Sequence, residues 1–292
     1  MLANVVLGVL GLLTLWFCIV WVKGLKAEKA EAPTVHQTVV GFVTNFFDTL
    51  GIGSFAPTTA WYKTTKLVED RIIPGTLNVG HALPVIVMAF IFIGRVEVEP
   101  VTLSLMLFAA VAGAYLGADI VSGLPERKIQ IGMGVALFIT AGFMLLGMLD
   151  LMPSGGEALG LTGGKLIIAV VVNFMLGALM TLGIGLYAPA MALVYALGMS
   201  PLVAFPIMMG SCAYLMPAAS VKFVKKGAYS TKGALGLTLG GIPAVFIAAY
   251  LVTSLPMDIL RWLVVGIILY TSVTMLRSAM KPRDEKAPEV AS

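Results

Sequence analysis

The chain has 292 residues, of which 59% are hydrophobic and 12% are charged. The charged share is about half that of a soluble domain, which excludes an ordinary soluble protein and indicates an integral membrane protein. The net charge of +4 does not indicate nucleic-acid binding, because the basic residues cluster at the edges of apolar runs, where they orient a membrane protein. Cys18 and Cys212 lie far apart inside apolar runs, so neither a disulfide framework nor a metal site is predicted, and no cofactor is expected.

Nine apolar segments are predicted in chain order, and most are near the ~20 residues that cross a bilayer core. They run over about 3–22, 37–62, 77–94, 100–121, 129–149, 165–198, 201–221, 233–252 and 259–277. The first segment lacks the basic start and the small cleavage-site residues of a signal peptide. We therefore interpret it as a retained transmembrane helix, which a short charged linker joins to the second segment.

The second and sixth segments are interrupted by the same pattern. "TLGIGSFAPTTAWY" covers residues 49–62 and "TLGIGLYAPAMALVY" covers residues 181–195, at an offset of 132. Gly51 and Gly53 allow backbone angles that bulky residues resist, and Pro57 suits the first turn of a new helix. We predict a broken helix in each segment, since such breaks are tolerated at membrane depth where other protein or a water-filled cavity satisfies the freed backbone groups.

The repetition extends beyond the breaks, because Gly80 matches Gly210 at an offset of 130. The predicted fold is an all-α polytopic membrane protein with one extra N-terminal helix and two internal repeats in a single transporter domain. Its parts are the N-terminal helix and linker (1–36), repeat A (37–149), repeat B (165–278) and a solvated C-terminal tail (279–292).

The distribution of basic residues predicts the topology. Under the positive-inside rule, the better fit makes the repeats inverted, each with three full crossings and one broken re-entrant hairpin. The N-terminus then lies outside and the C-terminus inside, with cytoplasmic loops at 69–71 and 126–128.

Internal duplication with discontinuous helices is common in secondary transporters, whose substrate sites lie near the midplane. The second half-helix of each break points its N-terminus, with free N–H groups and a partial positive charge, at the break, so we predict an anion site there. The candidate substrate-binding residues are Asn45, Thr49, Gly51, Gly53, Ser54, Pro57, Thr58, Thr181, Gly183, Gly185, Tyr187 and Pro189. For any single hydroxyl, a hydrogen bond back to its own helix is the alternative.

Two ionisable residues inside the apolar segments are candidates for ion coupling. Asp48 lies three residues before Gly51 and is predicted to carry a coupling proton, with a structural carboxylate that holds the break as the alternative. His81 is a second candidate, with a hydrogen-bonded core histidine as its alternative. Sodium is the other coupling ion considered.

The duplicated Gly-x-Gly-x-x-x-Pro breaks, the small-residue patterns in "AAVAGAYLGADIVSGLP" and "GGIPAVFIAAYLVTSLP", and the length of the chain resemble the sulfite exporter TauE/SafE family, also called the TSUP family of membrane permeases. The resemblance covers nearly the whole chain after residue 36. It implies a permease of the bacterial inner (plasma) membrane that exports sulfite, a sulfonate or a related small organic anion. The glycine-rich run of many members is reduced here to Gly51 and Gly53, followed by Ser54 and Phe55, so the substrate stays open.

An anion channel is the main alternative, since broken helices also build ion filters. An intramembrane hydrolase with Ser54 as nucleophile and His81 as base is a weaker one, because the repeat places Leu186 opposite Ser54 and the sequence suggests no third orienting group. We therefore predict a transporter and no enzyme. Its expected partners are a small anion and the lipid bilayer, and a homodimer is compatible with the sequence.

Overall fold

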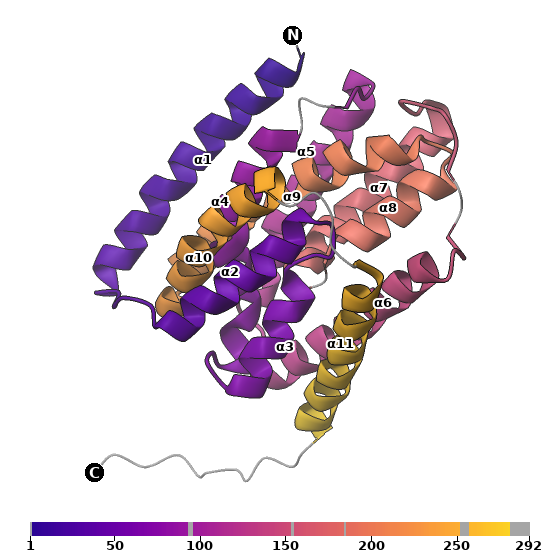
Figure 1. Cartoon of the computed structure of the whole chain (residues 1–292). Helices are drawn as coiled ribbons and strands as arrows, with labels where there is room; N and C mark the ends of the chain where they lie inside the picture. The colour runs from indigo at the N-terminus through magenta and orange to yellow at the C-terminus, as the bar shows by residue number, and fades with distance from the viewer. Residues whose placement is uncertain (1, 93–95, 153–154, 184, 252–256, 281–292) are drawn as a thin grey trace, which may run out of the picture.

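The computed structural model describes residues 2–92, 96–152, 155–183, 185–251 and 257–280, and within these ranges all its regular elements are helices (Figure 1). The elements are α1 (Leu2–Ala27), α2 (Val35–Thr49), α3 (Phe55–Thr65), η1 (Asp70–Ile72), α4 (Ile73–Phe92), α5 (Pro100–Val121), α6 (Glu126–Met148), α7 (Gly163–Met180), α8 (Tyr187–Ala196), η3 (Pro201–Val203), α9 (Ala204–Lys225), α10 (Thr231–Leu251) and α11 (Met257–Met280). The order from α2 to α6, with one short 3-10 helix, recurs from α7 to α11.

Seven helices in the described part of the chain are long and apolar enough to cross a membrane: α1, α4, α5, α6, α7, α9 and α10. This confirms the prediction of an all-α, multi-pass integral membrane protein. Helix α7 reaches this length with 18 residues, which span roughly 27 Å, slightly less than a typical ~30 Å hydrocarbon core. Helices α2, α3 and α8 are shorter still.

Both predicted interruptions are present as turns between two helices. Gly51 and Gly53 each have φ of 90°, and Gly183 has φ of 99°, in the left-handed region that favours glycine. The second helix of each pair begins two residues before its proline, so Pro57 and Pro189 are the third residues of α3 and α8. A proline is tolerated there because the N–H groups of the first turn have no intrahelical partner.

The two helices of each interrupted segment fold back on one another. The Trp61 Nε1–H near the end of α3 donates to His36 Nε2 at the start of α2, at 2.9 Å. Lys165 Nζ near the start of α7 donates to the Leu197 carbonyl just after α8, at 3.0 Å. The pairs α2/α3 and α7/α8 are therefore helical hairpins whose tips are the glycine-containing turns.

The two hairpins open at opposite ends of the bundle. The α2/α3 hairpin opens beside the start of α10, where the Tyr62 hydroxyl donates to a backbone carbonyl. The α7/α8 hairpin opens beside the start of α5, where Glu99 N donates to the carbonyl of Leu159 just before α7. Helices α5 and α10 start at opposite ends, because Asp119 near the end of α5 pairs with Lys226, which shortly precedes α10.

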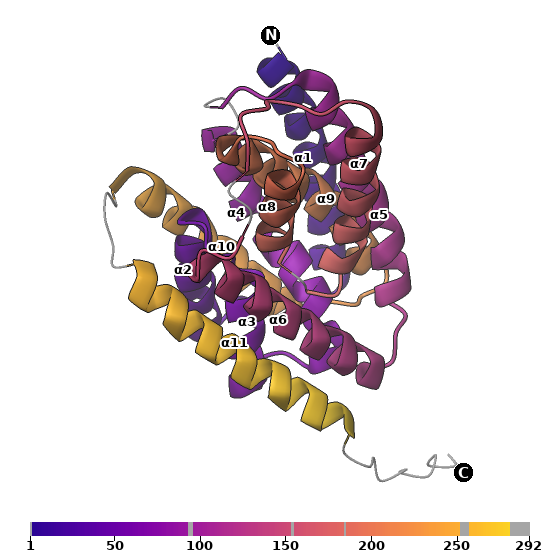
Figure 2. The same ribbon diagram turned by 90° about the vertical axis from the view of Figure 1, so that its right-hand side faces the viewer.

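The helix packing follows the same correspondence. Helix α2 packs against α10, and α7 packs against α5. Helices α4 and α9 contact each other and are the most buried of the seven long helices, α4 also touching α10 and α9 touching α5. Helices α6 and α11 pack together on one side, and α1 lies at the edge of the bundle against α9 (Figures 1 and 2).

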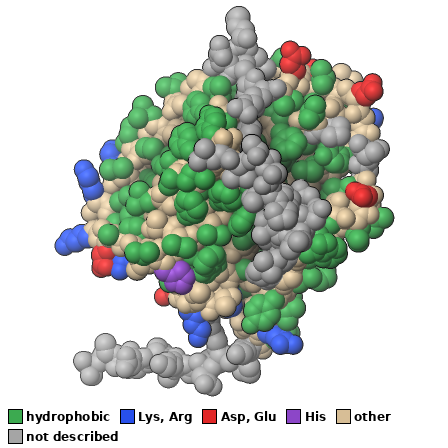
Figure 3. Space-filling model, viewed as in Figure 1, with side chains coloured by type: hydrophobic (Ala, Val, Ile, Leu, Met, Phe, Trp, Pro, Cys, Tyr) green, Lys and Arg blue, Asp and Glu red, His purple; other side chains and the backbone are tan. Residues whose placement is uncertain are grey.

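Charged side chains divide between the two ends of the bundle. On the face shown in Figure 3, most Lys and Arg side chains gather at the lower left and bottom, near the ends of α1 and α11, and acidic side chains are more frequent at the upper right. The described ion pairs lie at the basic end: Lys63–Asp70, Lys222–Asp119, Lys226–Asp119 and Lys232–Glu31. The hydrogen bond from Lys232 lowers the pKa of Glu31.

Candidate functional site

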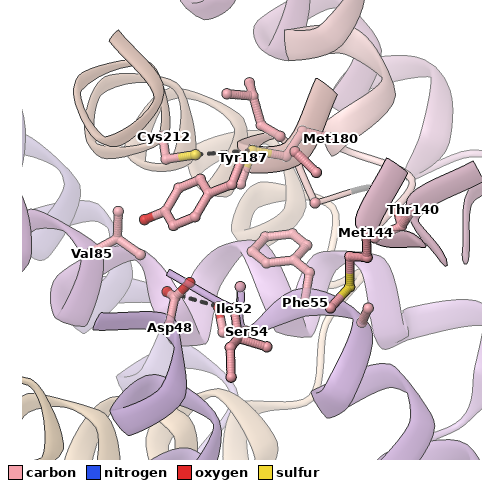
Figure 4. Close-up of a pocket in the computed structure, with 15 residues that line it drawn as sticks. Asp48, Ile52, Ser54, Phe55, Val85, Thr140, Met144, Met180, Tyr187 and Cys212 are labelled. Atoms are coloured by element: carbon pink, nitrogen blue, oxygen red, sulfur yellow. Dashed lines mark hydrogen bonds between the residues drawn. The ribbon is translucent and has the colours of Figure 1, made fainter. Parts of the chain in front are cut away.

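The turns of the two hairpins together line a cavity (Figure 4). Its lining residues are Asp48, Ile52, Gly53, Ser54, Phe55 and Ala56 from the first hairpin, Met180, Gly185, Leu186, Tyr187 and Ala188 from the second, Val85 from α4, Thr140 and Met144 from α6, and Cys212 from α9. The cavity volume is about 30 Å³, enough for one or two water-sized groups. In the close-up, Asp48 and Ser54 lie across the cavity from Tyr187 and Cys212.

The first turns of α3 and α8 face this cavity without a side-chain cap. Ser54 and Leu186 occupy the N-cap positions, and neither accepts a hydrogen bond from the turn that follows. Serine is a favoured N-cap residue, but the Ser54 hydroxyl instead donates to Asp48 Oδ2 at 3.0 Å. Asp48 also accepts from the backbone N–H of Ser54. The N–H groups left for a ligand in the cavity are therefore those of the first two residues of α3 and of α8, and they carry partial positive charge.

Asp48 is the only formally charged residue in the described lining of the cavity. Its side chain is buried, with 2% of the residue exposed, and Ser54 holds one carboxylate oxygen. No Lys or Arg belongs to the described lining, so any anion there would be bound by backbone groups and hydroxyls and would lie beside a carboxyl group.

His81 lies behind the first hairpin and joins its two helices. The Asn45 amide nitrogen donates to the carbonyls of Gly41 and Leu237, so Asn45 Oδ1 accepts from His81 Nδ1 at 3.0 Å. His81 Nε2 lies 3.0 Å from the Thr58 hydroxyl. A neutral imidazole with its proton on Nδ1 satisfies both contacts when the Thr58 hydroxyl donates its one hydrogen to His81 Nε2 and not to the Ser54 carbonyl, which lies 2.8 Å away. His81 thus bridges α2 and α3, which favours the core-histidine interpretation over a titrating one.

The second hairpin has a related bridge built from different residues. Asn173 on α7 donates to the carbonyl of Met106 on α5 at 2.7 Å and to the Ser211 hydroxyl on α9 at 3.1 Å. Ser211 corresponds to His81 at the repeat offset of 130. The first bridge joins α2 to α10 and α4, and the second joins α7 to α5 and α9. Only the first bridge contains an imidazole.

The predicted site residues fall into two groups. The cavity brings together Asp48, Gly53, Ser54, Gly185 and Tyr187, and Gly51 lines an adjoining cavity. The other predicted residues do not line the cavity between the two hairpin turns: Asn45, Thr49, Pro57, Thr58, His81, Thr181, Gly183 and Pro189. Two of these hydroxyls donate back to their own helices, Thr49 to Asn45 and Thr181 to Ala178. The Thr58 hydroxyl lies within hydrogen-bonding distance of both the Ser54 carbonyl and His81 Nε2. Their role as ligands stays a prediction.

Ten lining residues were not among the predicted site residues. Five belong to the two hairpins beside predicted positions (Ile52, Phe55, Ala56, Leu186 and Ala188), and the other five are Val85, Thr140, Met144, Met180 and Cys212. Met180 is the counterpart of Asp48 at the offset of 132, so the repeat itself could have pointed to it. The Cys212 thiol lies 3.7 Å from the Met180 sulfur, and its place inside an apolar run gave no sign of a role at the cavity. Thr140 and Met144 reach the cavity because α6 packs beside the hairpins, which no local motif indicates.

The observed hydrogen bonds do not join Ser54 to His81, the pair that the hydrolase alternative requires. Ser54 donates to Asp48, whereas the imidazole of His81 contacts Asn45 and Thr58. Among the described residues, no three His, Cys, Asp or Glu side chains come together to hold a metal ion.

Comparison of the chain with family models, curated proteins and solved structures finds no match. The inference of function therefore rests on the cavity and on the two hairpins that form it.

Proposed function

We propose that the protein is a secondary transporter that moves a small anion across the bacterial inner membrane by alternating access, as a permease related to the TauE/SafE family. The observation that carries the proposal is a cavity lined by residues of both hairpin turns, with Asp48 and the starts of α3 and α8 around it. The two halves are treated as inverted repeats, each with three crossings and one re-entrant hairpin. This is supported by the recurring order of elements and by the opposite openings of the hairpins.

The anion is proposed to bind where α3 and α8 begin. Each helix terminus contributes typically 0.3–1 kcal/mol to binding a charge, and up to ~2 kcal/mol in a partly buried geometry. Two termini together therefore support weak to moderate binding, with Ser54 and the Tyr187 hydroxyl as further polar contacts. Such a site releases its ligand more readily than a buried ion pair, as a transport cycle requires.

The carboxyl group of Asp48 would couple binding of the anion to binding of a proton. An anion about 4 Å from an ionised carboxylate would be repelled by ~4 kcal/mol at an effective dielectric constant of about 20. That repulsion equals the most that two helix termini offer. We therefore assign Asp48 the coupling role: a proton on its carboxyl group accompanies the anion, and both leave together.

Substrate and mechanism can be tested on purified protein. A thermal-shift screen of sulfite, sulfonates and short carboxylates should identify a stabilising anion, which is then used in proteoliposomes. The transporter predicts saturable flux driven by a pH gradient, and dependence on a sodium gradient instead would replace the proton as coupling ion. Large unitary currents would contradict the transporter and favour an anion channel. Export is the direction that the resemblance implies, and it is tested by loading the anion inside.

A further inference from the structure

Helices α6 and α11 lie together at one side of the bundle and are here called the α6/α11 pair (Figure 2). They pack against each other, and the Ser272 hydroxyl on α11 donates to the carbonyl of Gly134 on α6 at 2.6 Å. Midway along the pair, a small hydrophobic cluster separate from the main core joins both helices to the start of α3. Its buried members are Ala56, Leu137, Ala141 and Ile268.

The α6/α11 pair meets the rest of the bundle mainly at the helices that begin at the hairpin turns. Helix α11 packs on α3, whereas α6 packs on α8 and on η1. Helix α6 also reaches the second turn directly, because an added Cβ at Gly132 would lie 3.3 Å from the Leu182 side chain. A movement of the pair would therefore change what covers the two helix starts of the proposed anion site.

Two cavities lie between the α6/α11 pair and the hairpins. The first, here called the inner cavity, is the one between the two helix starts, and Thr140 and Met144 of α6 line one side of it (Figure 4). The second, here called the outer cavity, adjoins it and has a volume of about 180 Å³. Its lining residues are Gly51, Ile52, Phe143, Met144, Gly147, Met148, Met152, Tyr187, Ala188 and Met191. Those from α6 belong to the second half of that helix, so the outer cavity extends away from the end where α6 begins.

The α6/α11 pair is closed onto the bundle at the opposite, basic end, where α6 begins. Ile129 and Met133 near the start of α6 belong to the main hydrophobic core. Between them, Gln130 donates to Asp70 Oδ2 at 2.9 Å, and Asp70 also pairs with Lys63 of α3. Packed and hydrogen-bonded side chains thus join α6 to the bundle at the end that faces the cytoplasm under the proposed topology, while the outer cavity separates α6 from the hairpins toward the other end.

The same dipeptide precedes both helices of the pair in the sequence. Leu124-Pro125 precedes α6, and Leu255-Pro256 precedes α11 at an offset of 131. Pro125 is the N-cap of α6 and has an extended backbone, whereas residues 252–256 lie outside the described part of the chain. Because a proline cannot continue the preceding helix, α6 starts independently of α5. A helix that starts at such a break can change its angle to the preceding one through a few element-terminal residues.

From this arrangement we propose that α6 and α11 move as one unit against the hairpin turns during transport. Tilting the α6/α11 pair would separate Gln130 from Asp70 at the basic end and bring the second half of α6 onto the outer cavity. The inner cavity would then face the basic end instead of the outer cavity. The inference rests on the alternating access of the proposed function and names its moving part.

The test locks the α6/α11 pair in its observed position with a disulfide. In a Cys18→Ser background, Gly132→Cys/Leu182→Cys places two thiols where α6 meets the second hairpin turn. The readout is labelling of Cys212, which lines the inner cavity, by a small impermeant thiol reagent in inside-out vesicles, followed by mass spectrometry of its peptide. We expect oxidation to lower this rate by about tenfold or more, because the state open at the basic end is removed from the population. Reduction by dithiothreitol should restore the rate, and labelling in right-side-out vesicles should not fall on oxidation.

The reduced form of the same protein is the first control, because it carries both substitutions. Gly134→Cys/Ser272→Cys is the matched control, since its disulfide joins α6 to α11 inside the pair, where Ser272 already contacts Gly134. We expect oxidation of this variant to leave the labelling rate of Cys212 unchanged. A slowed rate would show that α6 and α11 do not move as one unit, and an unchanged rate in oxidised Gly132→Cys/Leu182→Cys would overturn the proposal.

A second lock places the disulfide at the basic end. Asp70→Cys/Gln130→Cys joins η1 to α6 where the two native side chains are hydrogen-bonded. Compared with its own reduced form, the oxidised variant should also protect Cys212 from labelling in inside-out vesicles. Equal rates in the two forms would contradict an opening at this end.

Labelling of Cys212 needs no substrate, so its outcome is independent of the proposed function. If sulfite, sulfonates and short carboxylates all fail to bind while both locks still block access from the basic end, the transporter proposal fails and the moving unit stands. If an anion is transported equally by the oxidised and reduced forms, the moving unit fails and the transporter proposal stands.

Discussion

The two hairpins have similar backbones but different side chains at the cavity. Each contains a glycine with positive φ, and each second helix starts without a side-chain cap. At corresponding positions the first hairpin has Asp48 and Ser54, and the second has Met180 and Leu186. Under the proposed function this difference is a division of labour, in which both halves supply backbone groups for the anion and only the first supplies the group that carries a proton.

The asparagines that anchor the two hairpins occupy different positions on α2 and α7. Helix α2 has Gly41 followed one turn later by Asn45, whereas the corresponding positions of α7 are Asn173 and Gly177. An added Cβ would lie 2.5 Å from a backbone atom of α10 at Gly41 and 2.2 Å from the Ala110 carbonyl of α5 at Gly177. Helices α2 and α7 each have one glycine that lets a neighbouring helix approach closely and one asparagine whose amide bridges to neighbouring helices. The glycine comes first on α2, and the asparagine comes first on α7.

The largest expected effect is a difference in cysteine labelling between equivalent loops of the two halves, which the inverted arrangement places on opposite sides of the membrane. In a background with Cys18→Ser and Cys212→Ser, we expect a cysteine at Arg71 to resist an impermeant thiol reagent added to intact cells. A cysteine at Leu202, the exposed residue between α8 and α9, should react readily. The same result is expected for cysteines in the 126–128 loop as for Arg71. Ready labelling at 71 and 126–128 would contradict the inverted arrangement.

Removing the ionisable group of the first hairpin tests the division of labour. Asp48→Asn keeps the shape of the side chain but cannot carry the proton, so transport driven by a pH gradient should fall to background while anion binding persists. Asp150→Asn, which changes an exposed loop carboxylate with positive φ, is the matched control and should transport normally. Unchanged pH-driven transport in Asp48→Asn would return Asp48 to a structural role.

The ion pair at the open end of the first hairpin has no counterpart in the second. Lys63 pairs with Asp70, and the positions offset by 132 are Tyr195 and Leu202. In a Cys18→Ser background, Asp70→Asn should raise the labelling rate of Cys212 in inside-out vesicles, because this end is then held closed less tightly. An ion pair worth ~0.5–1 kcal/mol corresponds to a change of about two- to fivefold.

The charge-reversed double variant Lys63→Asp/Asp70→Lys should restore slow labelling of Cys212. Leu202→Asn in the second half is the control and should leave the rate unchanged. Equal labelling rates in the parent and Asp70→Asn would show that the ion pair does not restrict access.

A further pair of variants compares the stability that the two bridges provide. His81→Ala removes the partner of both Asn45 Oδ1 and Thr58, so it should lower the free energy of unfolding by about 1–3 kcal/mol. Ser211→Ala should cost only ~0.5–1.5 kcal/mol, because Asn173 still donates to the carbonyl of Met106. Denaturant unfolding in detergent measures both variants. Equal losses would mean that the imidazole bridge has no special role in the first half.

The helices and breaks were predictable because their signals are local. The predicted segment 100–121 has the same limits as α5, and the glycine and proline pattern marked both interruptions correctly. Helix α1 extends to Ala27, beyond the predicted 22, because the charged residues that end the apolar run still continue the helix. Thr140 and Met144 were missed because their place at the cavity depends on how α6 packs, which no pattern within α6 encodes.

The central claim is that both hairpin turns form one anion site. Isothermal titration of Gly53→Val and Gly185→Val, with the anion that most stabilises the parent, tests it most directly. Each β-branched side chain would project at a helix start and block access to backbone N–H groups, and Gly53 also has a φ that valine resists. Gly142→Val, at a glycine with open space and no positive φ, is the control for folding and insertion. The account predicts that both turn variants lose anion binding while the control retains it, and full affinity in either turn variant would contradict a shared site.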